Sequence, residues 1–342
     1  ITRKKIMDNL LILIILIFNF FLFSQNDLIS NKINLFDHPD NNRKIHFKKV
    51  AITGGFFIFV NLIFLFIFLK IDFFQFSNFF FQNKREFVSF LLLISSLFLI
   101  GIYDDKYDLN PLKKLFLYAF FILICLLIDK NLIIKELNFY SGNFSIKLFN
   151  LAIPFTLLSI LLFVNALNMF DGIDLQVSLY SLFLFIYFIF KFDIIFFILV
   201  IPVLLFVIFF NYKKKLFLGD SGSNILATLI SFVLIKEYNY GYGSIYCEEI
   251  FLLMLIPGLD MLRLFINRII RGKNPFLSDD QHLHHLYLNK FSQNLTVFII
   301  QLHIFIPILI FNLYNSVIIV ILFVSIFVYL ISIFYLKLIL KN

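Results

Sequence analysis

Asn165-Ala-Leu-Asn168-Met-Phe-Asp171-Gly172-Ile-Asp174 is a polar segment between two long apolar runs. Carboxylates next to apolar runs are costly to place and usually have a function there. The two Asn and two Asp residues recur every third position. On a helix each therefore neighbours the next, although an ideal helix rotates the ends of the series apart. Gly172 relaxes this geometry and would let both carboxylates turn toward one ligand.

Two carboxylates close together repel each other unless a cation or a proton lies between them. A hard divalent cation such as Mg²⁺ prefers oxygen ligands and retains water molecules that a phosphate can replace. Asp171 and Asp174 therefore favour a Mg²⁺-assisted phosphate site.

The chain has 342 residues, of which 61% are hydrophobic, and its mean hydropathy is +0.95. Apolar runs of roughly 16–22 residues, about the length that crosses a bilayer, recur from end to end. We therefore expect an all-α polytopic membrane protein that forms a single domain over residues 1–342. The first apolar run has no small-residue cleavage site and is interpreted as a span rather than a signal peptide. Two cysteines, Cys125 and Cys247, give neither a disulfide framework nor a metal-binding pattern.

About eleven transmembrane helices are expected, with the active site in a cleft on the cytoplasmic face. Counting crossings puts the polar clusters on one side together with most of the 29 Lys and Arg residues, which is the bias of cytoplasmic loops. The net charge of +8 suits loops at an anionic membrane surface, whereas the scattering of basic residues argues against nucleic-acid binding. The expected spans are about 9–24, 51–69, 87–102, 112–129, 151–167, 177–191, 193–210, 221–236, 248–266, 293–313 and 316–338.

This count depends on the apolar segment 177–210. It has about 34 residues and would be roughly 51 Å long as one helix, too long for a single crossing. We place a break at Lys191-Phe-Asp193, which gives two short spans. A single tilted helix would instead move the later loops to the other side and separate the polar clusters.

Two polar clusters lie in the first part of the chain. The loop that begins at Asp37 contains Arg43, Lys44 and His46 and leads to Gly54-Gly55. It is either an ordinary basic cytoplasmic loop or a phosphate clamp in which Gly55 allows close backbone approach.

The second cluster, Asp104-Asp105-Lys-Tyr-Asp108, ends a span shortly before Pro111. Adjacent carboxylates point apart on a helix, so Asp104 and Asp105 are expected to have different roles. One would accept a proton or act as a nucleophile, and the other would bind a metal or pair with a lysine. The alternative is a solvated turn.

Phe217-Leu-Gly219-Asp220-Ser221-Gly222 precedes another apolar run. Asp220 or Ser221 could simply cap the following helix. Two glycines, a carboxylate and free helix N–H groups also suit a metal–diphosphate site. A Walker-type phosphate loop is excluded, because no Gly-Lys-Ser/Thr follows.

The last long loop contains Arg271 and the string His282-Leu-His284-His285. Three close histidines could bind zinc, but no cysteine or glutamate stands at a supporting spacing. Histidines among basic residues serve more naturally as donors to phosphate oxygens. Asp260 follows Pro257-Gly258 inside a span, where we expect a helix break that lets the acid face a cavity.

Taken together, these motifs resemble those of the polyprenyl-phosphate N-acetylhexosamine-1-phosphate transferases, a membrane family of the glycosyltransferase family 4 type. Five motifs stand in the family's order across about residues 37–285. The family transfers a sugar 1-phosphate from a UDP-sugar to a lipid phosphate and releases UMP. The histidine string is most similar to the undecaprenyl-phosphate GlcNAc-1-phosphate transferase branch, which starts O-antigen, enterobacterial common antigen or teichoic acid linkage units. The peptidoglycan-precursor branch, which transfers phospho-MurNAc-pentapeptide, is the alternative.

The resemblance implies a role for each motif. Asp220 would be the main Mg²⁺ ligand, with Asp171 also at the metal, Asp174 lining the metal–diphosphate site and Mn²⁺ as an alternative ion. Asp104 would deprotonate the lipid phosphate with help from Asp105, and Phe217 would stack on the uracil. The implied substrate-binding residues are Arg43, Lys44, His46, Asn165, Asn168, Asn211, Phe217, Arg271, His282, His284 and His285.

The chain also departs from the family's usual pattern. Leu175-Gln176 stand where Gly-Leu usually follows the last aspartate of the central motif, and a proline is replaced around Ala51. Asp280 stands where relatives with this histidine string often carry a basic residue. The segment from Asn211 to Asp220 is one residue shorter than usual.

The resemblance implies a multi-pass enzyme of the bacterial inner membrane whose active site faces the cytoplasm. Its partners would be a UDP-N-acetylhexosamine, undecaprenyl phosphate and membrane lipid, with a homodimer left open. A secondary transporter is the alternative from another class. A transporter would have ionisable groups near the middle of its spans and an internal repeat that relates its two halves. The sequence shows neither pattern. An inactive relative retained for binding or assembly is a third interpretation.

Overall fold

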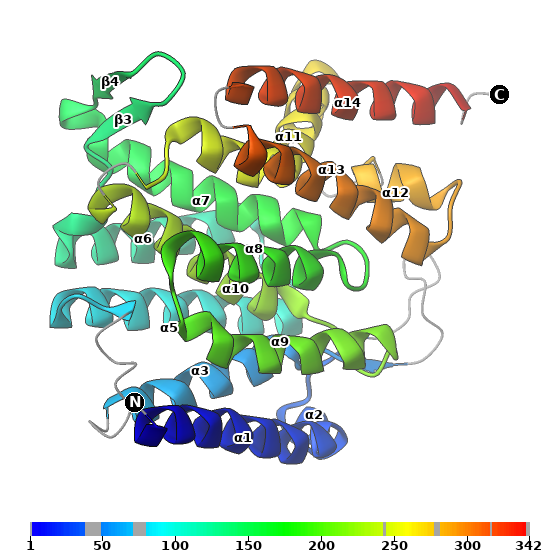
Figure 1. The fold of residues 1–342 in the computed structure, drawn as a ribbon. Helices are drawn as coiled ribbons and strands as arrows, with labels where there is room; N and C mark the ends of the chain where they lie inside the picture. Colours follow the sequence, from blue (N-terminus) through cyan, green and yellow to red (C-terminus); the bar gives the residue numbers. More distant parts are fainter. Residues whose placement is uncertain are drawn as a thin grey trace. The chain divides into compact units, whose positions relative to one another are not determined.

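The computed structural model describes residues 2–37, 49–70, 80–241, 244–276, 281–314 and 317–339. These residues form helices and two small antiparallel sheets of two strands each (Figure 1). The expected all-α class is therefore confirmed.

The chain folds as two compact units, each built from separate stretches of sequence. Unit 1 comprises residues 1–109 and 177–230, and unit 2 comprises residues 110–176 and 231–342. Helix α10, Gly219–Tyr240, begins in unit 1 and continues into unit 2.

Unit 1 is held together by apolar helix contacts and a buried amide pair. Helix α9 packs against α1 and α3. Within the core, Asn19 of α1 and Asn61 of α3 exchange two side-chain hydrogen bonds of 2.9 Å, so neither amide is left unsatisfied. The elements of this unit are α1 (Thr2–Ser24), α2 (Asn26–Ile33), β1 (Phe36–Asp37), β2 (Val50–Ala51), α3 (Gly54–Lys70), α5 (Lys84–Tyr107), α8 (Gln176–Phe192), α9 (Phe196–Tyr212) and the start of α10.

Unit 2 is organised around α11, which packs against α7, α13 and α14, while α7 also packs against α6. A hairpin of β3 and β4 pairs Glu136 with Lys147 and Phe139 with Phe144. The Glu248 carboxylate, near the start of α11, accepts hydrogen bonds from the backbone of Tyr140 and Ser141 at the hairpin's turn. The elements are α6 (Pro111–Ile128), η1 (Lys130–Leu132), β3 (Glu136–Phe139), β4 (Phe144–Lys147), η2 (Phe149–Leu151), α7 (Ala152–Phe170), the end of α10, α11 (Cys247–Ile270), α12 (Leu283–Leu288), α13 (Gln293–Leu313) and α14 (Ile318–Ile339).

Several helix ends follow from local sequence signals. Asn83 caps α5 by accepting the Glu86 N–H, and Asn110 caps α6 by accepting the Leu112 N–H. Pro111 is the first residue of α6, where its missing N–H has no helical partner to lose. Residues 108–110 thus form a short connection between α5 and α6.

The helix break placed in segment 177–210 is also confirmed. Helix α8 ends at Phe192 and α9 begins at Phe196. The second helix runs back alongside the first (Figure 1), and the rings of Phe185 and Phe197 stack with centroids 4.4 Å apart. The break expected at Pro257-Gly258 is wrong, because α11 is one continuous helix from Cys247 to Ile270.

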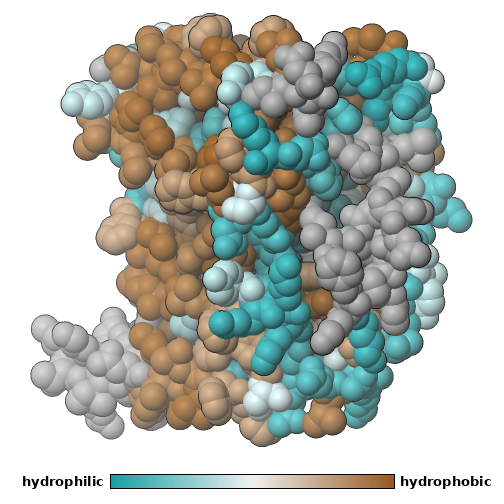
Figure 2. Space-filling model, turned by 90° about the vertical axis from the view of Figure 1, so that its right-hand side faces the viewer, coloured by the Kyte–Doolittle hydropathy of each residue, from teal (hydrophilic) through white to brown (hydrophobic). Residues whose placement is uncertain are grey.

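Among the described residues, five helices are long and apolar enough to cross a membrane, or six if α1 and α2, bent by 59° at their junction, form one broken span. Three shorter apolar helices lie at 54–68, 176–192 and 196–212. Many large apolar side chains on helix flanks are exposed, for example Phe20 at 73% and Phe116 at 71%. Figure 2 shows such a hydrophobic flank beside a band of hydrophilic side chains. These features support a multi-pass membrane protein, because apolar flanks of this extent need lipid or a partner to cover them.

Candidate active site

In unit 1, the end of α5 is tied to the beginning of α10 by the carboxylate of Asp105. Oδ1 of Asp105 accepts the Asp220 N–H at 2.7 Å, and Oδ2 accepts the Ser221 N–H at 3.1 Å. The first N–H groups of a helix have no partner within the helix, so a carboxylate there is a favourable cap. Asp105 is thus the cap of α10, supplied from a distant part of the chain, and it fixes the backbone that carries Asp220.

Asp104, the neighbour of Asp105, turns to its own helix end instead. Its Oδ1 accepts the Leu109 N–H at 2.6 Å, and its backbone carbonyl accepts the Asp108 N–H. Asp108 itself terminates α5 with a left-handed backbone, φ +53°. The two adjacent carboxylates therefore have different surroundings, as their helical geometry predicts.

Two glycines, Gly55 of α3 and Gly101 of α5, allow these helices to meet α10 at backbone distance. A Cβ at Gly55 would overlap Gly222 N, and a Cβ at Gly101 would overlap Ser221 Cα. Because the space at Gly55 is filled by α10, the close approach predicted there is made to a helix rather than to a phosphate. Because these glycines have no side chains, the first turn of α10 packs directly against the backbones of α3 and α5.

The segment before α10 is pinned by short backbone pairing. Phe217 N–H donates to the Ala51 carbonyl at 2.8 Å, and Gly54 N–H donates to the Phe217 carbonyl at 3.0 Å. Phe217 itself is half-buried. Asn211 is buried, and its Nδ2 donates to the Leu216 carbonyl at 2.9 Å. In the structure Asn211 therefore helps to shape the loop that presents Phe217.

In unit 2, α7 ends at Phe170 and the central motif continues as a loop rather than as a helix. Asp171 follows the last helical residue, and α8 begins at Gln176. Asp174 accepts a hydrogen bond from Nε2 of Gln293 at 2.9 Å. Asn168 accepts one from Nζ of Lys114 at 3.4 Å, whereas Nδ2 of Asn165 lies 3.7 Å from the Met261 sulfur. The motif's polar groups thus have individual partners.

Leu175 holds the position where the resembling family usually has glycine, and its backbone has φ +74°. A left-handed backbone costs a residue with a side chain about 1–2 kcal/mol, and glycine avoids this cost. We therefore expect Leu175→Gly to be more stable than Leu175→Ala by about 1 kcal/mol, since both lose the same apolar side chain. Thermal unfolding in detergent compares them directly. Equal midpoints for the two variants would show that this loop is not strained.

The histidine string meets the central loop at Gly172. A Cβ at Gly172 would overlap the imidazole Nε2 of His284, so only glycine leaves room for the ring. His284 is buried, with 1% of its surface exposed, and no hydrogen-bond partner of its Nε2 is found among the described residues. Its ring lies nearly parallel to that of His282, at an angle of 10° with centroids 5.3 Å apart.

The surroundings of His284 disfavour its cation. Burial lowers the pKa of His284 well below its ordinary value, and the neighbouring His285 and His282 lower it further. The unfolded chain binds a proton at this histidine near pH 6.5, whereas the folded chain does not. Acidification through this range therefore favours the unfolded state.

We expect thermal stability in detergent to fall as the pH drops from 7 to 5, with His284 contributing up to about 1.4 kcal/mol per pH unit. The variant His284→Gln removes this contribution, so its unfolding midpoint should depend less steeply on pH than that of the wild type. The measurement is the unfolding midpoint at a series of pH values in one detergent. Parallel curves for the two proteins would contradict the burial of a neutral His284.

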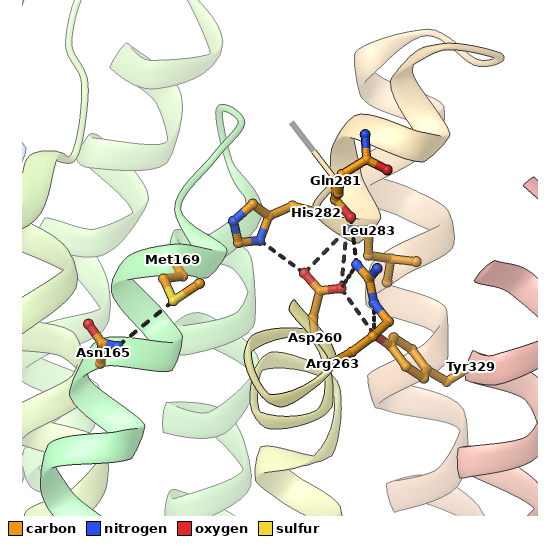
Figure 3. Close-up of polar contacts among 8 residues, drawn as sticks. All are labelled: Asn165, Met169, Asp260, Arg263, Gln281, His282, Leu283 and Tyr329. Carbon is orange, nitrogen blue, oxygen red and sulfur yellow. Dashed lines mark hydrogen bonds and ion pairs between the residues drawn. The ribbon is translucent and has the colours of Figure 1, made fainter. Parts of the chain in front are cut away.

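Asp260 anchors the beginning of the histidine string (Figure 3). Its Oδ2 lies 3.1 Å from Nδ1 of His282, and both its oxygens lie 3.2 Å from the Leu283 N–H. Arg263 and Tyr329 contact Oδ1 at 2.8 and 3.0 Å. Asp260 therefore lies buried in a polar cluster.

Other predicted residues lie apart from these contacts or outside the described part of the chain. Arg271 caps the end of α11 and is exposed. Arg43, Lys44 and His46 are outside the described residues, as is Asp280. Within the described ranges, no three His, Cys, Asp or Glu side chains are grouped so that they could hold a metal ion.

Sequence reasoning did not assign a role to Arg263 or Tyr329. The spacing of Asp260 and Arg263, three residues apart on one helix, is a signal for the ion pair. Tyr329 lies in the apolar helix α14, and nothing in its local sequence indicates a polar contact.

Comparison with known proteins links this geometry to a family. The family model for glycosyl transferase family 4 matches residues 87–237, which run from α5 to α10 and contain Asp104, Asp171 and Asp220. Three of the similar proteins bear the name undecaprenyl-phosphate alpha-N-acetylglucosaminyl 1-phosphate transferase. The one from Yersinia pestis is 26% identical over 78% of this chain and 74% of its own length. Those from Escherichia coli O157:H7 and Thermotoga maritima are 26% and 28% identical, over 81% and 83% of this chain and 75% and 83% of their own lengths. The chain is therefore similar to glycosyl transferase family 4 proteins over residues 87–237, in agreement with the resemblance that its motifs indicate.

Proposed function

We propose that this chain transfers N-acetylglucosamine 1-phosphate from UDP-N-acetylglucosamine to undecaprenyl phosphate and releases UMP. The main support is the similarity to enzymes named for this acceptor and this sugar phosphate, which extends over 78% to 83% of the chain. The motif residues add to it, because carboxylates and histidines lie at helix ends in both units, where loops leave the apolar spans.

In the proposed reaction, an oxygen of the lipid phosphate forms a bond to the β-phosphorus of the UDP-sugar. The bond between that phosphorus and the bridging oxygen breaks, and the oxygen leaves with UMP. Asp104 at the end of α5 is the proposed acceptor of any proton on the lipid phosphate. Histidines and basic residues would balance the charge on the departing UMP.

The donor set suits Mg²⁺, which is part of the proposal. Asp220 lies in the first turn of α10, is half-buried, and has its backbone fixed by Asp105. Its carboxylate oxygens are hard ligands of the kind that Mg²⁺ prefers. When bound, the ion would neutralise negative charge on the diphosphate.

The proposed location is the bacterial inner membrane, with about eleven crossings and the site on the cytoplasmic side. The candidate spans and the shorter apolar helices support several crossings. A lipid acceptor gives a physical reason for this location, since its phosphate would lie at the interface while its tail remains among the helices.

The test is UMP release by the purified protein in detergent. We expect UMP when UDP-N-acetylglucosamine, undecaprenyl phosphate and Mg²⁺ are all present, and none when the lipid phosphate is omitted or the metal is chelated. UMP release from UDP-MurNAc-pentapeptide alone would assign the chain to the other branch. No UMP from either donor would overturn the proposal.

A further inference from the structure

A buried polar cluster in unit 2 lies next to the histidine string. It consists of Asp260 and Arg263 on α11 and Tyr329 on α14. Their side chains are 5%, 12% and about 1% exposed, respectively. Arg263 donates to Asp260 Oδ1 at 2.8 Å and, through Nε, to the Tyr329 hydroxyl at 2.9 Å. Tyr329 donates in turn to Asp260 Oδ1 at 3.0 Å.

These bonds determine the state of the Asp260 carboxyl group. It accepts from a guanidinium, a phenol and the Leu283 N–H, and these donors, above all the positively charged guanidinium, favour the ionised carboxylate. A buried carboxylate is retained only when it is paired and hydrogen-bonded, and Arg263 supplies the charge partner. Asp260 is therefore an acceptor toward His282 as well.

Because Asp260 is a hydrogen-bond acceptor, it determines which nitrogen of the His282 ring carries a hydrogen. The contact of 3.1 Å between Asp260 Oδ2 and Nδ1 requires that Nδ1 carry the hydrogen. The ring's second nitrogen, Nε2, points away from Asp260 (Figure 3). Nε2 is thus the nitrogen that His282 can offer to a ligand, and its direction is set by Asp260.

The same carboxylate also places the rest of the string. It accepts the Leu283 N–H at the start of α12, and the Arg263 guanidinium donates to the Gln281 carbonyl at 2.6 Å. His282 is stacked on His284, whose imidazole meets Gly172 beside Asp171. The Asp260 carboxylate on α11 is therefore the first of a series of contacts that runs through His282 and His284 to the central loop at Gly172.

We propose that Asp260, supported by Arg263 and Tyr329, is a positioning residue that orients His282 so that its Nε2 faces the diphosphate of the sugar nucleotide. This inference rests on the proposed function. It adds to that function a residue which acts through His282 and does not itself touch the substrate.

A double-mutant cycle tests the inference. We expect Asp260→Asn to lower kcat/KM for UDP-N-acetylglucosamine by about 10–100-fold, the usual effect of losing a residue that orients a ligating histidine. In a His282→Ala background the same substitution should change kcat/KM by less than about 3-fold, because the side chain that it orients is already gone. A purely structural role would give the same factor in both backgrounds.

Glu248→Gln is the matched control. Glu248 is a second buried carboxylate on α11, and its hydrogen bonds go to Tyr140 and Ser141, away from His282. Its substitution should lower the unfolding midpoint while acting independently of His282→Ala. Tyr329→Phe is the milder variant if Asp260→Asn does not fold, because it removes one donor and keeps the carboxylate. It should show a smaller coupling in the same direction.

A second readout does not depend on the reaction. Carbethoxylation of His282 by diethylpyrocarbonate, followed by mass spectrometry, should become several-fold faster in Asp260→Asn and stay unchanged in Glu248→Gln. If the wild type transfers no sugar phosphate but carbethoxylation still responds, the proposed function is wrong and the positioning role stands. Suppose instead that the wild type transfers the sugar phosphate, that the effects of Asp260→Asn and His282→Ala are additive, and that carbethoxylation of His282 is unchanged. The positioning role is then wrong.

Discussion

Replacing Asp220 with Asn is expected to reduce UMP release by on the order of 10³-fold while leaving the protein folded. The substitution keeps the size of the side chain and the backbone N–H that Asp105 accepts, so the cap of α10 remains. It removes the negative charge that the proposed metal needs. The measurement is UMP release at saturating UDP-N-acetylglucosamine together with the unfolding midpoint.

Asp27→Asn is the matched control for this prediction. Asp27 is also an acidic residue in the first turn of a unit 1 helix, α2, but it is exposed and outside every motif. It should transfer the sugar phosphate at the wild-type rate. Wild-type turnover in Asp220→Asn would refute the role of Asp220 as a metal ligand. A lowered midpoint in Asp220→Asn, with activity lost in proportion, would show that its role is to hold the fold.

The parts of this fold that sequence predicts are those fixed by neighbouring residues. Pro111 begins a helix because its ring and its missing N–H suit that position and few others. The break between α8 and α9 follows from length, since the apolar segment exceeds one crossing and contains Lys191 and Asp193 at its middle. Both signals are local, and each was sufficient to place a helix boundary.

The parts that sequence did not predict depend on contacts between distant segments. Asp105 caps a helix that begins more than a hundred residues later, and no pattern around Asp105 specifies that partner. Tyr329 reaches Asp260 from an apolar helix in the same way. At Pro257 the local rule gave the wrong answer, because a helix packed among other helices can keep its course despite one lost hydrogen bond.

The candidate site shows the same division. Residue types and order single out Asp104, Asp220 and the histidine string as candidates, because metal–phosphate chemistry uses such groups. Which atoms each of them contacts could be learned only from the coordinates. Asp105, which the resemblance gives an assisting role in proton transfer, has both oxygens engaged by the backbone of α10, whereas Oδ1 of Asp104 accepts the Leu109 N–H.

Gly172→Ala is expected to lower kcat/KM for UDP-N-acetylglucosamine by about 10²-fold, because displacing a substrate-binding group by even 1 Å can cost that much. An added Cβ would overlap Nε2 of His284, which is buried and packed against His282 and His285. The imidazole or the loop beside Asp171 must therefore shift. Steady-state kinetics measures the effect.

Gly258→Ala separates this displacement from a general effect of adding a methyl group. Gly258 is a helical glycine of α11 in the same unit, and a Cβ there would meet no atom within 4 Å. Alanine favours helix over glycine by about 1 kcal/mol, so this variant should be at least as stable as the wild type and fully active. Equal activity of the two alanine variants would show that His284 can move aside without consequence. A loss confined to Gly172→Ala would instead mean that the histidine string and the central aspartate loop act as one rigid surface, whose spacing is set by the absence of a single methyl group.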